Sequence, residues 1–146
     1  MRGCLLHDNC SDCCCHDKPG VFSKLDIEDK KILYKNRREI KFKAGETIFK
    51  QNTTVTHIAC IRTGFIKAFG EGLNGKNILV RIVQPGELVG GMGMYVDELH
   101  HFTCNALTDI DCCLIDVNSF KETMEKNHQF TLDLFKRVNR FAVNGH

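Results

Sequence analysis

The sequence HIACIRTGFIKAFG, residues 57–70, decides the fold class of this chain. It contains two short, mostly apolar runs, residues 57–62 and 65–69, with Gly64 between them as a turn residue. Similar strand-like runs recur on both sides and are bounded by glycines or by Pro85-Gly86. They cover residues 47–50, 78–83, 103–107 and 111–117, and Ile40 and Phe42 alternate with Lys41 and Lys43 before them. Several short strands between regular turns predict an all-β sandwich or barrel.

Helical patterns flank these strands. Residues 25–33 place acidic residues before Lys30 and Lys31, and Asp26 is the candidate N-cap. After the strands, Asn118 and Ser119 are N-cap candidates for a short helix, and Asn127-His128 is a break before a longer one. The longer helix carries an apolar stripe that either packs on the chain's own core or forms a dimer seam. The stripe consists of Leu134, Phe135, Val138, Phe141 and Ala142.

The composition limits the class of protein. The chain has 146 residues, 42% of them hydrophobic, and a formal net charge of +2. It therefore suits one folded domain and gives no strong electrostatic footprint for nucleic acid or anionic membrane. We find no apolar run of ~20 residues for a membrane helix and no signal peptide, so we expect a cytoplasmic protein with reduced thiols. Its nine cysteines are then not readily a disulfide framework.

Five of the nine cysteines lie in residues 1–20, a segment with too few large aliphatic residues to build its own core. The spacing Cys10-x-x-Cys13 lets two thiolates bind one metal through a turn. Cys113 lies in a strand pattern on the same face as Ile115 and Val117. The other cysteines of the strand region are interpreted as small core residues. These are Cys60, Cys104 and Cys112.

Several short motifs, in this order and spacing, resemble the sensory domain of the Crp–Fnr superfamily of transcription regulators. They are KAGETIF (43–49), IRTGFIK (61–67), QPGELVG (84–90) and ALTD (106–109), followed by Phe120. The resemblance implies a mainly β fold with flanking helices, a double-stranded β-helix of the jelly-roll type followed by a long C-terminal dimerisation helix. We expect a Cys-rich segment at 1–20, a cyclic nucleotide-binding-like β-roll at 21–127 and the start of the dimerisation helix at 128–146.

The same resemblance implies a function and partners. The chain is expected to be an effector-sensing domain that forms a homodimer through its last helix. It would reach DNA only through a helix-turn-helix domain, which we do not expect within these residues. The alternative is a module that binds a cyclic nucleotide or another small ligand and has no DNA-binding activity of its own.

In the resembled family, the motif at 84–90 begins a cassette that cradles a cyclic phosphate. Gly86 allows its tight turn, Leu88 follows it, and Glu87 could accept a hydrogen bond from a ribose hydroxyl. The arginine that would pair with the phosphate is replaced by His100, with His101 beside it. Neutral histidine cannot hold two phosphate oxygens as arginine does, so cyclic nucleotide binding is disfavoured. The glycines could equally form a tight structural corner, and the histidines could simply be solvated.

Oxygen sensors of the fumarate–nitrate regulator type combine an N-terminal cysteine group with one cysteine after the Ala-Leu motif, which here is Cys113. We therefore expect Cys4, Cys10, Cys13 and Cys113 as iron–sulfur ligands, with Cys14 or Cys15 as substitutes. The spacing departs from that family, because the gaps are five and then two residues and Pro19 occupies the last ligand position. Zinc or thiol-redox chemistry and the absence of a metal both remain open.

The β-roll outline also resembles cupins, some of which are metal-dependent enzymes. Such a site needs His-x-His with a further Glu and His, whereas His100 and His101 are adjacent and His57 is the other histidine in the strands. We therefore do not expect an enzyme.

Overall fold

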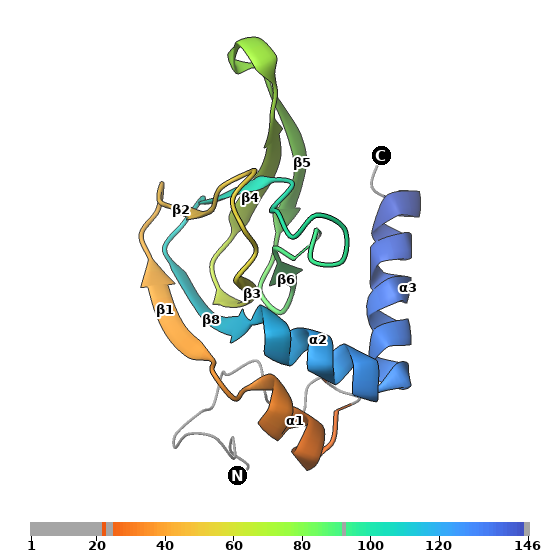
Figure 1. The fold of residues 1–146 in the computed structure, drawn as a ribbon. Helices are drawn as coiled ribbons and strands as arrows, with labels where there is room; N and C mark the ends of the chain where they lie inside the picture. The colour runs from red at the N-terminus through yellow and green to blue at the C-terminus, as the bar shows by residue number, and fades with distance from the viewer. Residues whose placement is uncertain (1–21, 23–24, 92, 145–146) are drawn as a thin grey trace.

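Two antiparallel sheets form the body of the computed structural model, which describes residues 22, 25–91 and 93–144 (Figure 1). Within these residues each sheet has four strands, in the orders β1-β8-β3-β6 and β2-β7-β4-β5. The strands are β1 (Arg38–Phe42), β2 (Thr47–Phe49), β3 (His57–Thr63), β4 (Ile66–Glu71), β5 (Asn77–Val83), β6 (Leu88–Val89), β7 (Thr103–Ala106) and β8 (Ile110–Asp116). The predicted mainly β, jelly-roll-type fold is confirmed.

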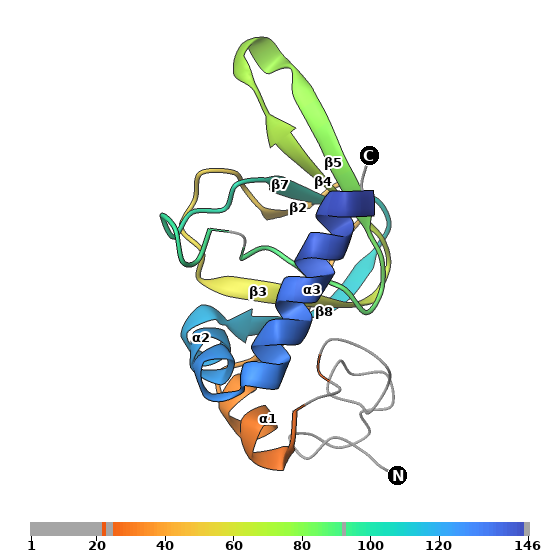
Figure 2. The ribbon, with the colours of Figure 1, turned by 90° about the vertical axis from the view of Figure 1, so that its right-hand side faces the viewer.

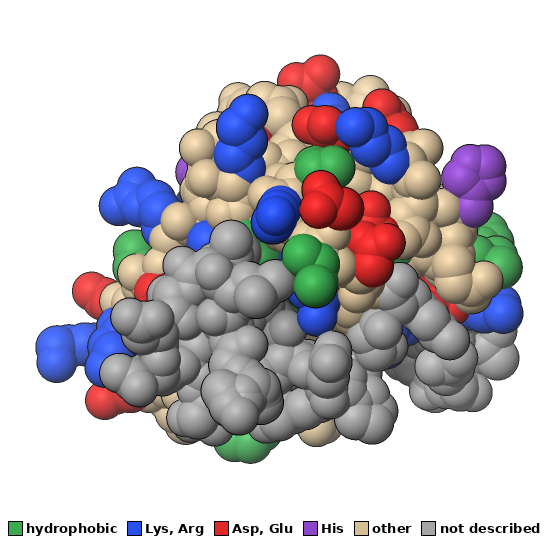
Figure 3. Space-filling view, turned by 90° about the horizontal axis from the view of Figure 1, so that it is seen from below, with side chains coloured by type: hydrophobic (Ala, Val, Ile, Leu, Met, Phe, Trp, Pro, Cys, Tyr) green, Lys and Arg blue, Asp and Glu red, His purple; other side chains and the backbone are tan. Residues whose placement is uncertain are grey.

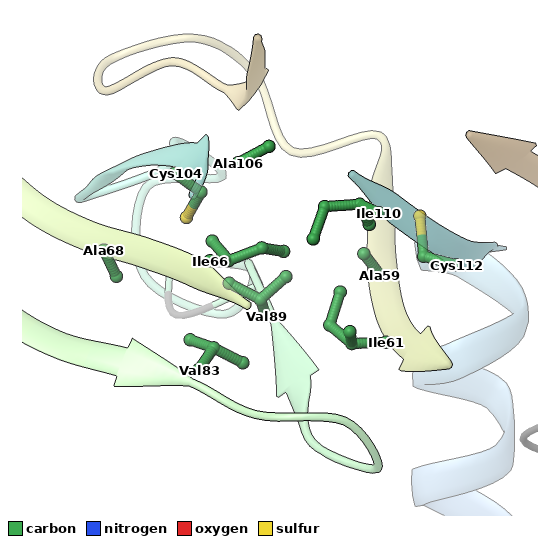
Figure 4. Packing of buried hydrophobic residues seen from close by; sticks show 10 residues of the cluster. All are labelled: Ala59, Ile61, Ile66, Ala68, Val83, Val89, Cys104, Ala106, Ile110 and Cys112. Atoms are coloured by element: carbon green, nitrogen blue, oxygen red, sulfur yellow. The ribbon is translucent and has the colours of Figure 1, made fainter. Parts of the chain in front are cut away.

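The interior between the sheets is apolar. Figure 4 shows Ile61, Ile66 and Val89 pointing toward one another from strands of both sheets. Ile40 and Phe42 of β1 pack against this cluster, whereas Lys41 between them is exposed. The period-two alternation in the sequence therefore separates the buried face from the solvated one, and burial of the apolar face stabilises the sheet pair.

Helix α1 (Ile27–Leu33) precedes the strands. Its predicted N-cap is confirmed, because Asp26 Oδ1 accepts a hydrogen bond from Asp29 N at 2.9 Å. None of the helices within the described residues combines the length and apolar character that crossing a membrane requires.

Helix α2 (Val117–Lys126) follows β8 directly, and α3 (His128–Asn144) follows the predicted break at Asn127. The predicted N-caps Asn118 and Ser119 of α2 are wrong, because Asp116 is the N-cap and its Oδ2 accepts from Ser119 N at 3.0 Å. The last residue of the strand thus also caps the helix, which fixes the direction in which α2 leaves the sheet.

A second apolar cluster joins the outer face of the β1-β8-β3-β6 sheet to the helices. Phe22, Phe120 and Phe130 belong to it, and the ring of Phe22 lies 6.1 Å from that of Phe130 in α3. Asn127 Nδ2 donates to Asp29 Oδ2 at 2.6 Å, which ties α1 to the junction of α2 and α3. Figure 2 shows α3 running from this junction along the side of the β-roll.

The hairpin of β4 and β5 projects beyond the rest of the β-roll (Figures 1 and 2). Its tip contains a short 3-10 helix, Leu73–Gly75. On the face seen from below, acidic and basic side chains of the described residues lie side by side (Figure 3).

Candidate functional site

The turn before β6 is attached to β3 by its backbone. Gly86 N donates to Ile61 O at 2.7 Å, and Ile61 N donates to Glu87 O at 3.1 Å. Gly86 has a φ of 90°, the left-handed region that glycine adopts without strain. Leu88, two residues after Gly86, packs against the outer apolar cluster. We use "cassette" below for residues 84–101.

The carboxylate of Glu87 is bonded within the cassette. Its Oε1 accepts a hydrogen bond from Gln84 N at 2.9 Å and forms an ion pair with Arg81 of β5. These two bonds engage one of the two oxygens of the carboxylate that could accept a hydrogen bond from a ribose hydroxyl. In the described residues, Glu87 therefore holds the turn closed and joins it to β5.

His100 lies buried where the resemblance places a phosphate-binding arginine. Its side chain is 4% exposed, and its ring stacks on Phe49 with centroids 4.3 Å apart and planes 18° apart. Burial lowers the pKa of His100, so the neutral form is favoured near neutral pH. The position thus holds an aromatic stack instead of a cation.

Three glycines of the cassette, Gly90, Gly91 and Gly93, lie close to other protein atoms. A Cβ on Gly90 would meet the Phe49 ring at 2.7 Å, and one on Gly93 would meet Leu99 O at 2.1 Å. Exposed His101 places Nε2 2.9 Å from Asp97 Oδ1, and this hydrogen bond lowers the pKa of Asp97. These contacts agree with the structural-corner interpretation of the glycines.

Strand β8 presents its two adjacent cysteines on opposite faces. Cys112 belongs to the interior cluster and is 0% exposed, as the core interpretation predicted, and Cys104 of β7 lies in the same cluster. Burial raises the pKa of both thiols to about 12, so both remain protonated. Cys113 is equally buried but lies on the outer face, shared with Ile115 as predicted.

Cys113 has a guanidinium group beside it. Arg37 Nη1 donates to its Sγ at 3.7 Å, and the side chain of Arg37 is only 10% exposed. Arg37 also forms a 3.3 Å ion pair with Glu39 and lies over the Tyr34 ring, 5.9 Å from its centroid. The sequence analysis missed Arg37, because its position depends on the packing of the segment between α1 and β1.

A second arginine lies within electrostatic reach of the same sulfur. The pKa of Arg62 is raised chiefly by its hydrogen bond to Asp111, at 2.5 Å, and Cys113 contributes in the same direction. Cationic groups stabilise a thiolate over a thiol, and the thiolate is the metal-binding form. The surroundings of Cys113 therefore suit ligand chemistry, whereas those of Cys112 do not.

Cys60 of β3 lies directly opposite Cys113 in the register of β3 and β8. Opposite residues in an antiparallel pair point to the same face, so the two sulfurs share the outer face. Cys60 is 1% exposed, which fits the predicted core residue, but it is also disulfide-bonded. Sequence analysis missed this proximity because β3 and β8 are far apart in the chain. We call Cys60, Cys113 and Arg37 the thiol face.

The remaining predicted ligands, Cys4, Cys10 and Cys13, and their substitutes Cys14 and Cys15, lie outside the described residues. Within the described residues, no group of three or more His, Cys, Asp or Glu side chains is placed to hold a metal ion. A four-ligand site on the thiol face would therefore need donors from elsewhere in the chain.

Helix α3 divides its apolar residues between two environments. Phe130 is fully buried and Leu134 packs against the outer cluster. Leu132, Phe135 and Val138 are between 45% and 59% exposed and follow one another at three-residue steps. Both interpretations of the apolar stripe therefore retain support, because one side packs on the core and the other is open.

Comparisons with known proteins agree on the fold. The family model of the cyclic nucleotide-binding domain matches residues 39–127. The sensor domain of the transcriptional regulator DNR from Pseudomonas aeruginosa superposes with a TM-score of 0.73 at 14% identity, covering 83% of this chain and 82% of that one.

Two curated relatives share sequence with the chain. The nitrogen fixation regulation protein FixK of Bradyrhizobium diazoefficiens is 25% identical over 134 residues, which is 92% of this chain and 53% of FixK. The transcriptional activator protein FnrA of Stutzerimonas stutzeri is 26% identical, over 90% of this chain and 54% of FnrA. The chain thus spans about half the length of these relatives.

Proposed function

This chain belongs to the cyclic nucleotide-binding domain family, and we propose that it is the effector-sensing domain of a Crp–Fnr-type regulator whose site is the thiol face. The resemblance predicted from its motifs is confirmed, and the curated relatives are named as regulators, not enzymes. The effector is proposed to act through a cysteine-ligated metal site, with an iron–sulfur cluster as the leading candidate.

One observation carries this proposal: Cys113 lies on the outer face of the sheet with the partly buried Arg37 at its sulfur. Cysteine thiolates are the usual ligands of iron–sulfur clusters, and four of them give the site a net negative charge that a guanidinium offsets. Cys4, Cys10 and Cys13 are the proposed N-terminal ligands. When bound, such a cluster would supply chemistry that oxidation can change.

The described contacts support a route from this site to α3. Cys60 belongs to the outer cluster together with Phe22, Phe120 and Phe130, and Phe130 lies in the first turn of α3. Phe22 follows the cysteine-rich segment in sequence and touches Phe130. Release of the segment from the thiol face would therefore change the support of α3 and shift a two-state equilibrium.

The readout is proposed to be a homodimer formed through α3. Leu132, Phe135 and Val138 give the helix an exposed apolar stripe that an identical stripe on a second copy could cover. We expect Phe135→Glu to shift the chain toward the monomer in sedimentation equilibrium, with Lys136→Glu as the matched control. An unchanged mass distribution in Phe135→Glu would contradict this interface.

A cyclic nucleotide is the second candidate effector, because the matching family is that of the cyclic nucleotide-binding domain. The bonded carboxylate of Glu87 and the stacked ring of His100 argue against it.

The test of the proposed function is anaerobic purification and reconstitution followed by an assay of iron and acid-labile sulfide. The account expects both elements in the protein. A colourless, iron-free chain after reconstitution would overturn the cluster.

A further inference from the structure

We propose that the outer face of β4 and β5 is a docking surface for an acidic amphipathic helix of a partner protein. The surface consists of Phe65, Lys67, Leu79 and Ile82, and we call it the hairpin face. Its two strands form the hairpin that projects beyond the rest of the β-roll (Figures 1 and 2). The inference goes beyond the proposed function, because it assigns a protein partner to the other sheet and does not depend on a metal.

The register of β4 and β5 places these side chains on the side turned away from the interior. Ile66 pairs with Val83, and both belong to the cluster between the sheets. Lys67 pairs with Ile82, the next residues along each strand. Successive side chains of a strand point to opposite faces, so this second pair faces outward, and Phe65 shares the face with Lys67.

The same face continues past the register shift that follows Ala68. Phe69 pairs with Leu79 there, and Lys67 Nζ lies 5.0 Å from the centroid of the Phe69 ring. The ammonium group thus covers the Phe69 ring, which is buried, while Leu79 beside it is 58% exposed. The hairpin face therefore combines exposed apolar side chains with a cation between them.

An apolar outer face is unusual for a sheet of this kind. Antiparallel sheets commonly place apolar residues toward the core and polar residues toward water. Strand β1 follows this rule, because Ile40 and Phe42 pack inward and Lys41 is exposed. Strand β5 departs from it by exposing Leu79 and Ile82. Adjacent exposed apolar side chains of this type mark interaction sites.

The other sheet of the molecule shows which element covers such a face. Helix α2 packs on β3 and β8, and its Phe120 shares the outer cluster with Ile58 and Ile115 of those strands. An apolar helix stripe is thus the cover that this fold already uses on a sheet face. With the described helices in place, Leu79 and Ile82 stay exposed. A helix from a partner fits this second face in the same way.

The charges of the hairpin select an acidic partner. Residues 66–83 contain three basic side chains and one acidic side chain, Glu71. Glu71 is already bound to Lys50, with Oε2 2.6 Å from Nζ. Neither Lys67 nor Lys76 forms an ion pair with a carboxylate of the described residues. Carboxylates beside the apolar stripe of a partner helix would therefore meet complementary charge.

The same charges argue against a second copy of this chain as the occupant. The exposed apolar stripe of the chain lies on α3, and residues 128–144 contain one acidic and three basic residues. A second α3 would bring positive charge to Lys67 and Lys76, and like charges across an interface are unfavourable. The hairpin face thus fits a different protein.

The test uses two fluorescein-labelled synthetic peptides that form the same amphipathic helix. Both carry a leucine stripe, flanked by glutamates in the acidic probe and by lysines in the basic probe. Fluorescence anisotropy with the full chain measures binding. We expect the acidic probe to bind at least about 10-fold more tightly than the basic one. Its binding should weaken as the salt concentration rises.

Two variants locate the site, each with a matched control. Lys67→Glu should weaken binding of the acidic probe by about 10-fold, whereas Lys41→Glu, at an exposed lysine of β1, should not. Leu79→Ser should weaken it by about fivefold, whereas Val96→Ser, at an exposed apolar residue of the cassette, should not. Thermal unfolding verifies that each variant is folded, and Leu79→Ser keeps the test decisive if Lys67→Glu does not fold.

Three results would overturn the inference. The first is equal binding of the two probes, or no binding of the acidic probe. The second is equal affinity for the acidic probe in each variant and its control. The third comes from sedimentation equilibrium of the chain alone: a shift toward the monomer in Leu79→Ser would show that a second copy covers the hairpin face.

Discussion

The cassette and the thiol face differ in what surrounds their polar side chains. In the cassette, Glu87 is bonded to Gln84 and Arg81, and His100 is stacked on Phe49. On the thiol face, Cys113 has a guanidinium at its sulfur and a second cysteine opposite. A fold that can cradle a ligand with one loop can therefore close that loop with its own side chains and present donor atoms on another surface.

The largest expected effect concerns the packing that links the thiol face to α3. Phe130 is fully buried between Phe22 and Phe120. Truncation in Phe130→Ala should lower the free energy of unfolding by about 3–5 kcal/mol, because it leaves a cavity in the cluster. Urea denaturation measures it. Phe65→Ala, at an exposed phenylalanine, should cost less than about 1 kcal/mol. Equal losses of unfolding free energy in Phe130→Ala and Phe65→Ala would contradict the packing link between the thiol face and α3.

The next effect tests the charge at the thiol face. Arg37→Met keeps a long apolar side chain over Tyr34 but removes the guanidinium from Cys113. We expect Co²⁺ affinity to fall by about 10–100-fold, the usual cost of losing an outer partner of a metal ligand. Arg38→Met, at the exposed neighbouring position, is the control. If both variants bind Co²⁺ as tightly as the unaltered chain, Arg37 contributes to packing and not to metal binding.

A smaller effect concerns pH and the cassette. Because burial lowers the pKa of His100, the unfolded chain binds a proton there at a higher pH than the folded chain does. Stability should therefore fall as the pH decreases through about 6.5, the ordinary value for histidine. His100→Phe keeps a ring against Phe49 and should flatten this decline in thermal unfolding between about pH 7 and 5. His101→Phe should keep the decline. If the pH dependence of thermal unfolding is the same in the two variants, a group other than His100 causes the decline.

The smallest expected effect is on nucleotide binding. Calorimetry with cyclic AMP and cyclic GMP should give no binding, or binding only in the millimolar range, because the cassette has no arginine at His100. Micromolar binding of either nucleotide by the unaltered chain would show that the cassette, and not only the thiol face, is a ligand site.

The sequence predicted most of the fold but only part of the candidate site. Alternation within strands is local, so the face that Cys113 shares with Ile115 could be predicted from β8 alone, but which of the two faces is the outer one could not. The N-cap Asp116 was missed because it is also the last residue of a strand. The proximity of Cys60 and the position of Arg37 depend on strand pairing and side-chain packing between distant segments, which no local pattern encodes.

The central claim is that the thiol face is the functional site. It is tested most directly by the iron and acid-labile sulfide content of Cys113→Ala and Cys112→Ala, reconstituted side by side under anaerobic conditions. The two variants remove adjacent buried thiols on opposite faces of one strand. The account predicts that Cys113→Ala loses its iron and that Cys112→Ala keeps it. Equal iron content in the two variants would contradict the account.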